Sequence, residues 1–247
     1  MIYAFHGNLG EPQDWAAVLE FLNHEELNEL TGGSSVELWN LYNCLEHSME
    51  SFADKTNLEA RSKKSGKNIL FGYSLGGRLA FQCLAQNPKI WDAAVIVSAH
   101  PGLKDASERD LRFEQDQKWS EEVLKFPWPE FWGKWCEQPA LKDSPWGADR
   151  PEGPAEATRI ATAMVNWSLG RQEDLSSQIA ACGLPILLVS GENDSKYRKI
   201  ASSLSALAKN IEHVEILGSG HRVLREKPIE LAGEIRSFLG RCFRAKN

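Results

Sequence analysis

The sequence predicts an α/β protein in which a mostly parallel, doubly wound sheet is interrupted by one helical insertion. Short apolar runs alternate with segments of helical spacing before residue 103 and again after residue 184. The run Ala93–Ser98 is almost continuously apolar, as expected of a strand buried on both faces of a parallel sheet. Residues 103–170, in contrast, are charged, rich in tryptophan and without a good strand pattern. We therefore expect a core of residues 1–102 and 171–247 and a helical cap of residues 103–170.

The composition is that of an ordinary globular protein with one sizeable core. Of the 247 residues, 42% are hydrophobic and 25% are charged. No apolar run approaches about 18 residues, so we expect no membrane span. The N-terminal segment lacks the basic region of a signal peptide, which predicts a cytoplasmic protein.

Cysteine usage and charge restrict the cofactors and partners. The five cysteines are scattered without Cys-x-x-Cys spacing, so we expect reduced thiols, no disulfide framework and no zinc site. The net charge is −6 and no basic stripe occurs, which argues against nucleic acid. No phosphate-cradling loop or dinucleotide fingerprint implies a cofactor. A small anionic ligand is compatible with this charge if a few arginines gather around it. The sequence indicates no oligomeric state.

The first strand is expected at residues 2–5 and ends in the glycine-rich loop His6–Gly10. Asp14 is expected to cap a helix that begins at Trp15. The loop has two readings. It is either a plain strand-to-helix turn or an oxyanion loop, in which the N–H of Asn8 points at the same place as that of Leu75. The next expected elements are a strand at 36–41, a helix at 45–60, and a strand from 69 that leads into a helix ending at 86.

The stretch Ile69–Ala80 is the most informative of the chain. Its apolar run ends in Gly-x-Ser-x-Gly, and a helical segment follows at once, which is the pattern of a nucleophile elbow. Gly72 and Gly76 lack Cβ atoms, so strand and helix can approach closely around Ser74. The serine would stand at the helix N-terminus, where an oxyanion is stabilised. Because this motif is also common by chance, its function depends on partners elsewhere in the chain.

The segment between Trp119 and Trp167 holds six of the nine tryptophans. Most of them are expected to form the core of the cap, and one or two to line a pocket. After the insertion we expect strands at 184–190 and 213–217 and helices at 196–209 and 228–239.

Three reactive side chains follow predicted parallel strands, in the order Ser74, Asp194, His221. Open α/β sheets place their sites at the carboxyl ends of the strands, so these side chains can meet. A serine hydroxyl reacts only when an imidazole takes its proton, and the imidazole needs a carboxylate on its other nitrogen. We predict a catalytic triad in an α/β-hydrolase fold with an inserted helical cap.

Each member of the predicted triad also has a plainer interpretation. Asp194 could act only as the N-cap of the following helix, and Glu192 is a nearby alternative acid. His221 lies in a Gly-x-Gly-His turn that need not be catalytic. His100 precedes a Pro-Gly turn and is expected to have a structural role near the pocket.

Motifs beyond the triad are distributed along most of the chain. They are His6-Gly7, Gly72 to Arg78, His100-Pro101-Gly102-Leu103, the helix with Glu108, Arg109, Arg112 and Trp119, Trp135 with Gln138-Pro139, Gly191 to Tyr197, and Gly220-His221. Together they resemble the 2-succinyl-6-hydroxy-2,4-cyclohexadiene-1-carboxylate synthases of menaquinone biosynthesis. The elbow that ends in Arg78 and the Pro-Gly-Leu turn with its arginine-rich helix are more specific than the triad.

The resemblance implies a carbon–oxygen lyase rather than a hydrolase. In that family the triad serine acts as a base on a proton α to a carbonyl, and pyruvate is eliminated as a ring diene forms. The substrate carries several carboxylates, which arginines can bind by paired hydrogen bonds. By position, the resemblance assigns carboxylate binding to Arg78 and Arg112, pocket lining to Tyr73 and Trp135, and the N–H groups that hold the enolate oxygen to Asn8 and Leu75.

The chain also departs from the family pattern. Asn8 stands where an aromatic residue is usual, and Leu41–Cys44 bears no likeness to the family's Pro-Gly-His-Gly-type loop. The third cap arginine could be Arg150 or Arg159, and Arg112 could pair with an acid of its own helix. Two alternatives therefore stay open: a serine hydrolase (carboxylesterase or thioesterase) for a small acyl substrate, and a non-catalytic binding protein of the same fold.

Overall fold

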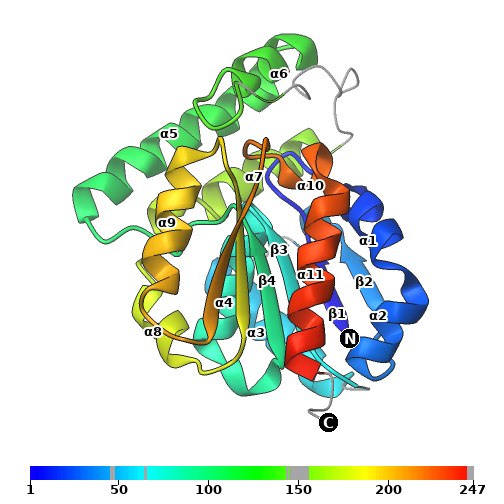
Figure 1. The fold of residues 1–247 in the computed structure, drawn as a ribbon. Coiled ribbons are helices and arrows are strands. Elements are labelled where there is room, and N and C mark those ends of the chain that lie inside the picture. The colour runs from blue at the N-terminus through cyan, green and yellow to red at the C-terminus, as the bar shows by residue number, and fades with distance from the viewer. Residues whose placement is uncertain (45–47, 64–65, 143, 145–155, 244–247) are drawn as a thin grey trace.

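The computed structural model describes residues 1–44, 48–63, 66–142, 144 and 156–243. Its strands form one six-stranded sheet in the order β2-β1-β3-β4-β5-β6, and every neighbouring pair is parallel (Figure 1). The strands are β1 (Ile2–Phe5), β2 (Val36–Trp39), β3 (Ile69–Tyr73), β4 (Ala93–Val97), β5 (Ile186–Gly191) and β6 (Ile211–Ile216).

The strand order reverses at β1, which is the feature that positions the site. The chain runs from β1 to β2 on one side and then returns to β3 on the other, so Phe5 is in register with both Trp39 and Gly72. Beyond such a switch point, the two neighbouring strands send their connections to opposite faces of the sheet and leave a crevice at their carboxyl ends. The loops after β1 and β3 both open into this crevice.

Helices cover both faces of the sheet because successive strand side chains point to opposite faces. Tyr3 and Phe5 belong to one apolar core, whereas Ile2 and Ala4 belong to the other. One face is covered by α3 (Met49–Ser62), α4 (Leu75–Gln86), α8 (Ser176–Ala181) and α9 (Ser195–Ser205). The other face is covered by α1 (Ala16–Leu22), α2 (His24–Thr31), α10 (Val223–Glu226) and α11 (Pro228–Phe243). The predicted doubly wound sheet is confirmed.

A helical insertion between β4 and β5 lies over the carboxyl ends of the strands (Figure 1). It contains α5 (Ala106–Lys125), α6 (Trp128–Cys136) and α7 (Ala157–Asn166). Its apolar residues Phe131, Ile160 and Trp167 are continuous with the core on the α3–α4 side. The inserted helical cap that the sequence predicts is therefore present.

The two ends of the insertion are joined to each other where they leave the core. The N–H of Leu103 donates to the carbonyl of Gln172 at 3.0 Å, and that of Leu175 donates to the carbonyl of Pro101 at 2.9 Å. Gly102 has a φ of 122°, and a Cβ atom there would lie 1.9 Å from the carbonyl oxygen of Glu173. Only glycine fits at position 102. We call the joined residues 101–103 and 172–175 the neck of the insertion.

The local prediction at Asp14 was wrong. A 3-10 turn over Pro12–Trp15 precedes α1, and the Asp14 carboxylate accepts a hydrogen bond from the N–H of Glu11 at 3.1 Å. It also pairs with Arg225 at 2.6 Å, so this acid joins two distant segments and is not the N-cap of α1. Helix α2 was not predicted, because its sequence is polar apart from Leu27 and Leu30.

Helix α3 begins at Met49, after the N-cap Ser48. Residues 45–47, where the predicted helix starts, lie outside the described residues. None of the helices that the structure describes is long and apolar enough to cross a membrane.

Candidate active site

Ser74 lies in the sharp turn between β3 and α4. Its φ of 51° and ψ of −108° place this non-glycine residue in a strained conformation, as a nucleophile elbow requires. The turn is packed directly against the end of β1. A Cβ atom on Gly76 would lie 2.4 Å from the carbonyl oxygen of Phe5, and the N–H of Gly76 donates to the carbonyl of His6 at 3.0 Å. The glycine spacing therefore fixes Ser74 beside the loop that follows β1.

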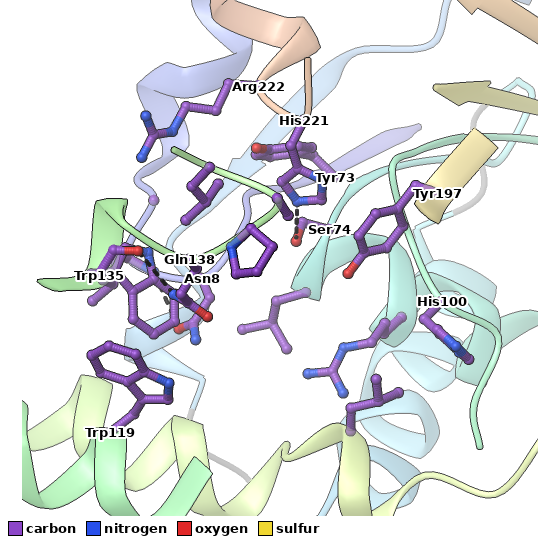
Figure 2. Close-up of a pocket in the computed structure, with 18 of the residues that line it drawn as sticks. Asn8, Tyr73, Ser74, His100, Trp119, Trp135, Gln138, Tyr197, His221 and Arg222 are labelled. Atoms are coloured by element: carbon purple, nitrogen blue, oxygen red, sulfur yellow. Dashed lines mark hydrogen bonds between the residues drawn. The ribbon is translucent and has the colours of Figure 1, made fainter. Parts of the chain in front are cut away.

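The structure brings Ser74, His221 and Asp194 together as the sequence predicts. His221 Nε2 lies 3.2 Å from Ser74 Oγ, and its Nδ1 lies 2.7 Å from Asp194 Oδ2. Figure 2 shows the His221 ring above the serine hydroxyl. Because the carboxylate can only accept, Nδ1 donates to it, which leaves Nε2 of the neutral ring free to accept from the serine. His221 and Asp194 are each only 5% exposed.

Asp194 caps the helix that follows it and contacts the imidazole at the same time. Its Oδ2 contacts His221, while its Oδ1 accepts from the N–H of Tyr197 at 3.3 Å and caps α9. The alternative acid, Glu192, is exposed, and its carboxylate accepts from the N–H of Gly218 at 2.8 Å. The helix cap thus holds the Asp194 carboxylate in the orientation that the imidazole needs.

Asn8 and Leu75 both line the cavity beside Ser74. Within the described part of the chain, neither backbone N–H donates to a protein acceptor. Their loop is held by His6, part of the His6-Gly7 motif. His6 Nε2 accepts from the N–H of Leu41 at 3.0 Å, and its Nδ1 donates to the carbonyl of Gly7 at 2.8 Å. Two unpaired donors at a strained serine can stabilise a developing oxyanion.

The cavity above Ser74 has a volume of about 430 Å3, within the usual range for a small-molecule site. Tyr73 and Trp135 line it, as the resemblance implies. The Tyr73 ring centre is 5.7 Å from that of His221, and burial raises the pKa of its hydroxyl well above the ordinary value. Trp135 is braced by Trp119, with ring centres 5.1 Å apart.

Arg78 lines the same cavity and is not a surface residue. Its guanidinium donates to the carbonyl of Trp167 at 2.5 Å and to the side-chain oxygen of Gln172 at 3.5 Å. Burial, followed by the nearby charge of Arg112, lowers its pKa to about 10, so it is still a cation at neutral pH. Among the described residues no carboxylate forms an ion pair with it.

Arg112 pairs with Asp116 on its own helix, with Nε 2.9 Å from Oδ1, which is the plainer of its two interpretations. It nevertheless lines the cavity. Asp116 also accepts from the hydroxyl of Ser168 at 2.7 Å, so its charge is shared between two donors. Arg112 is positioned by this pair and can still present its outer nitrogens to a ligand.

Of the two candidates for a third cap arginine, Arg159 is exposed, donates to the side chain of Asn43 and does not line the cavity. Arg150 lies outside the described residues. His100 borders the cavity, and its Nδ1 accepts from the N–H of Gly102 at 3.1 Å, which fits the structural role predicted for it. Burial, together with the charges of Lys196 and Arg78, lowers its pKa to about 4.

Sequence reasoning missed several residues of the cavity wall, notably Lys196, Tyr197 and Arg222. Tyr197 follows Asp194 by one helical turn, and its ring centre is 4.6 Å from that of His221. The position of these residues directly after Asp194 and His221 was the signal that could have identified them. In the part of the chain that the structure describes, no cluster of histidine, cysteine or acidic residues could hold a metal, and the five cysteines are free thiols.

Comparisons with known proteins bear on the family and on the fold. The model of the alpha/beta hydrolase family matches residues 4–234. A 2-succinyl-6-hydroxy-2,4-cyclohexadiene-1-carboxylate synthase of Escherichia coli O1:K1 is 29% identical over 95% of this chain and 91% of its own length.

Two solved structures share the fold. MenH from S. aureus has a TM-score of 0.79 at 21% identity, and the match covers 98% of this chain and 94% of that one. A thermophilic esterase from Thermogutta terrifontis has a TM-score of 0.73 at 20% identity, covering 98% and 90%. Because the family model matches most of this chain, the chain belongs to the alpha/beta hydrolase family.

Proposed function

We propose that this protein is a lyase of menaquinone biosynthesis that eliminates pyruvate from a cyclohexene intermediate carrying several carboxylates. The observation that carries the proposal is Arg78, a half-buried cation in the wall of the cavity that forms no ion pair with a carboxylate among the described residues. A charge that is partly removed from water and has no counter-charge is costly, and an anionic substrate would offset that cost. The likeness to synthases named for a product with a ring carboxylate and a succinyl chain supports the same substrate class.

The proposed reaction begins with removal of a proton α to a substrate carbonyl. Ser74 Oγ takes this proton while its own hydroxyl proton passes to His221 Nε2, and Asp194 stabilises the resulting imidazolium through Nδ1. The electron pair moves onto the carbonyl oxygen, where the N–H groups of Asn8 and Leu75 donate to the enolate.

In the second half of the reaction the enolate collapses and the ring diene forms. The carbon–oxygen bond to the leaving group breaks, and the leaving group takes a proton from His221 and departs as the enol of pyruvate. Arg78 and Arg112 hold substrate carboxylates and keep the acidic carbon over Ser74. Tyr73 and Trp135 pack against the ring. The small anionic substrate and a cytoplasmic location are part of the same proposal.

The direct test is pyruvate release from the pathway precursor, generated in situ, measured above the spontaneous rate. The Ser74→Ala variant should lose at least about a thousandfold in kcat, because the base is removed. If the folded wild-type protein releases no pyruvate above background, the lyase proposal is wrong.

The second candidate function is hydrolysis of a small ester or thioester, which the same triad and N–H groups would support. Arg78→Ala separates the two. For a polyanionic lyase substrate, kcat/KM should fall roughly a hundredfold, because a charge-assisted contact is lost. Turnover of a neutral acyl ester should be nearly unchanged. Equal losses for both substrates would remove the distinction between the two functions. A non-catalytic binding protein would show neither activity.

A further inference from the structure

Arg222 is a buried cation in the cavity wall, directly after His221. It is 8% exposed, and its side chain lines the cavity. Within the residues that the structure describes, its Nη1 is buried without any hydrogen-bond partner. A buried donor that has lost water and gained no acceptor is costly, and such donors are rare in native structures. Because the side chain also lines the cavity, an anionic ligand there is a candidate for the missing acceptor.

The contacts that Arg222 does make orient it without neutralising its charge. Its Nη2 donates to the sulfur of Cys136 at 3.3 Å, and its guanidinium carbon lies 5.7 Å from the ring centre of Trp132. Sulfur is a weak acceptor. Arg225, one helical turn later, provides the contrast, because it pairs with Asp14 at 2.6 Å. In the described part of the chain Arg222 has no such acid.

Arg222 and the pair of Arg78 and Arg112 form two groups of cavity cations that lie near different side chains. The charges of Arg78 and Arg112 act on His100 and Tyr197, whereas the charge of Arg222 acts on Tyr73. Figure 2 shows Arg222 on the side of Trp135 and Gln138, opposite Tyr197 and His100. In that view Ser74 lies between Arg222 and His100, so a ligand that reached both groups could extend over the serine hydroxyl.

We propose that Arg222 forms a second anion subsite, which binds a substrate carboxylate other than the ones held by Arg78 and Arg112. The inference rests on the proposed function for the presence of a second carboxylate on the substrate. A carboxylate oxygen at Nη1 would supply the missing acceptor and the missing counter-charge together. A ligand held at both ends would present its central carbon atoms to Ser74.

The plainer alternative is that Arg222 only fastens the cap to the core through Trp132 and Cys136. If Arg222 only fastens the cap, its replacement should weaken the binding of every ligand equally. If it forms a subsite, its replacement should weaken the binding only of ligands that carry one particular carboxylate. The test therefore needs ligands that differ by one carboxylate at a time.

Three stable probes provide this series without any turnover. They are 2-(3-carboxypropanoyl)benzoate, which has the ring carboxylate and succinyl chain in the relatives' printed product name, 4-oxo-4-phenylbutanoate, which lacks the ring carboxylate, and 2-acetylbenzoate, which lacks the chain carboxylate. Dissociation constants would be measured by calorimetry for the wild type, Arg222→Met, Arg222→Lys and Arg78→Met. Arg61→Met, at an exposed position near the end of α3, is the remote control.

Arg222→Met should weaken the binding of the dicarboxylate roughly tenfold or more, because a charge-assisted hydrogen bond is lost. It should weaken the binding of one monocarboxylate by a comparable factor and leave the binding of the other unchanged. Arg78→Met should show the opposite selectivity between the two monocarboxylates. Arg222→Lys keeps the charge but not the planar fork, so it should recover part of the affinity. Arg61→Met should bind all three probes as the wild type does.

Equal weakening of all three probes by Arg222→Met would overturn the subsite and leave the fastening role. No weakening at all, or a wild-type protein that binds the dicarboxylate no better than either monocarboxylate, would also overturn it. Melting temperatures of the variants would identify loss of fold as a cause of equal weakening. Because the probes do not react, a protein that releases no pyruvate can still show the selective effect, so failure of the lyase proposal and failure of the subsite are distinguishable.

Discussion

The two walls of the cavity are built in different ways. On the sheet side, Ser74, Asn8 and Asp194 stand on strand ends and are fixed by backbone hydrogen bonds, glycine contacts and a helix cap. On the cap side, Trp135 and Arg112 project from helices and are held by other side chains, Trp119 and Asp116. A backbone-fixed wall tolerates little change, whereas a side-chain wall can be altered one residue at a time.

This difference suggests a division of labour. In the proposed reaction the sheet side supplies proton transfer and oxyanion stabilisation, which many reactions share. The cap side, together with Arg78 and Arg222, would determine which ligand is held above Ser74. Substitutions on the sheet side should therefore lower kcat, and substitutions on the cap side should raise KM. The following predictions test that separation.

The largest effect is expected at the acid of the triad. Asp194→Asn can still cap α9, but it cannot stabilise the imidazolium, so kcat should fall roughly 10⁴-fold with little change in KM. The matched control is Glu192→Gln, which changes the exposed neighbouring acid and should keep kcat within about twofold. A large loss in the control with none in Asp194→Asn would move the acid role to Glu192. Steady-state kinetics with the purified variants would show whether Asp194 or Glu192 has the acid role.

A smaller effect is expected at the aromatic wall of the cap. Trp135→Leu removes ring surface from the cavity, so KM should rise about tenfold, or about 1.4 kcal/mol, while kcat changes little. Trp128→Leu is the control, because Trp128 stacks on Trp132 in the same helix but does not line the cavity. It should lower the melting temperature and leave KM unchanged. If both variants raised KM equally, the cap would be acting as a whole rather than through Trp135.

The smallest effect is expected at His100, where the two walls meet. Burial lowers its pKa from 6.5 to about 4, so between these values the unfolded chain binds more protons than the folded protein. Stability should therefore fall as the pH drops from 6.5 towards 4. His100→Asn keeps an acceptor for the N–H of Gly102 and removes the titration. Urea midpoints between pH 4 and 7.5 should decline less in the variant, and parallel curves would refute this assignment.

The sequence was sufficient to predict the sheet and the side chains that follow the ends of its strands. Apolar runs gave the parallel sheet, the glycine spacing gave the turn at Ser74, and chain order placed Asp194 and His221 at the same edge. Each of these depends on local pattern plus the general rule that parallel strands end together.

The remaining features depend on contacts between distant segments. Asp14 is not the N-cap of α1, and its carboxylate pairs with Arg225, more than two hundred positions away. Arg112 could not be assigned from sequence, since pairing with Asp116 and lining the cavity are compatible. Arg222 was not predicted as a site residue, because nothing in the sequence reveals that its Nη1 is buried without an acceptor. Propensity and motif contain no information on such three-dimensional pairing.

The neck of residues 101–103 and 172–175 has a consequence for how this chain could be remodelled. Because the insertion leaves and re-enters the core at adjacent, hydrogen-bonded positions, its ends are already the distance apart that a transplanted segment would have to span. A cap from another protein of this fold could be spliced at the neck without disturbing any strand, provided that Gly102 is retained. The neck is thus a natural crossover point for recombining new binding surfaces with an unchanged reactive centre.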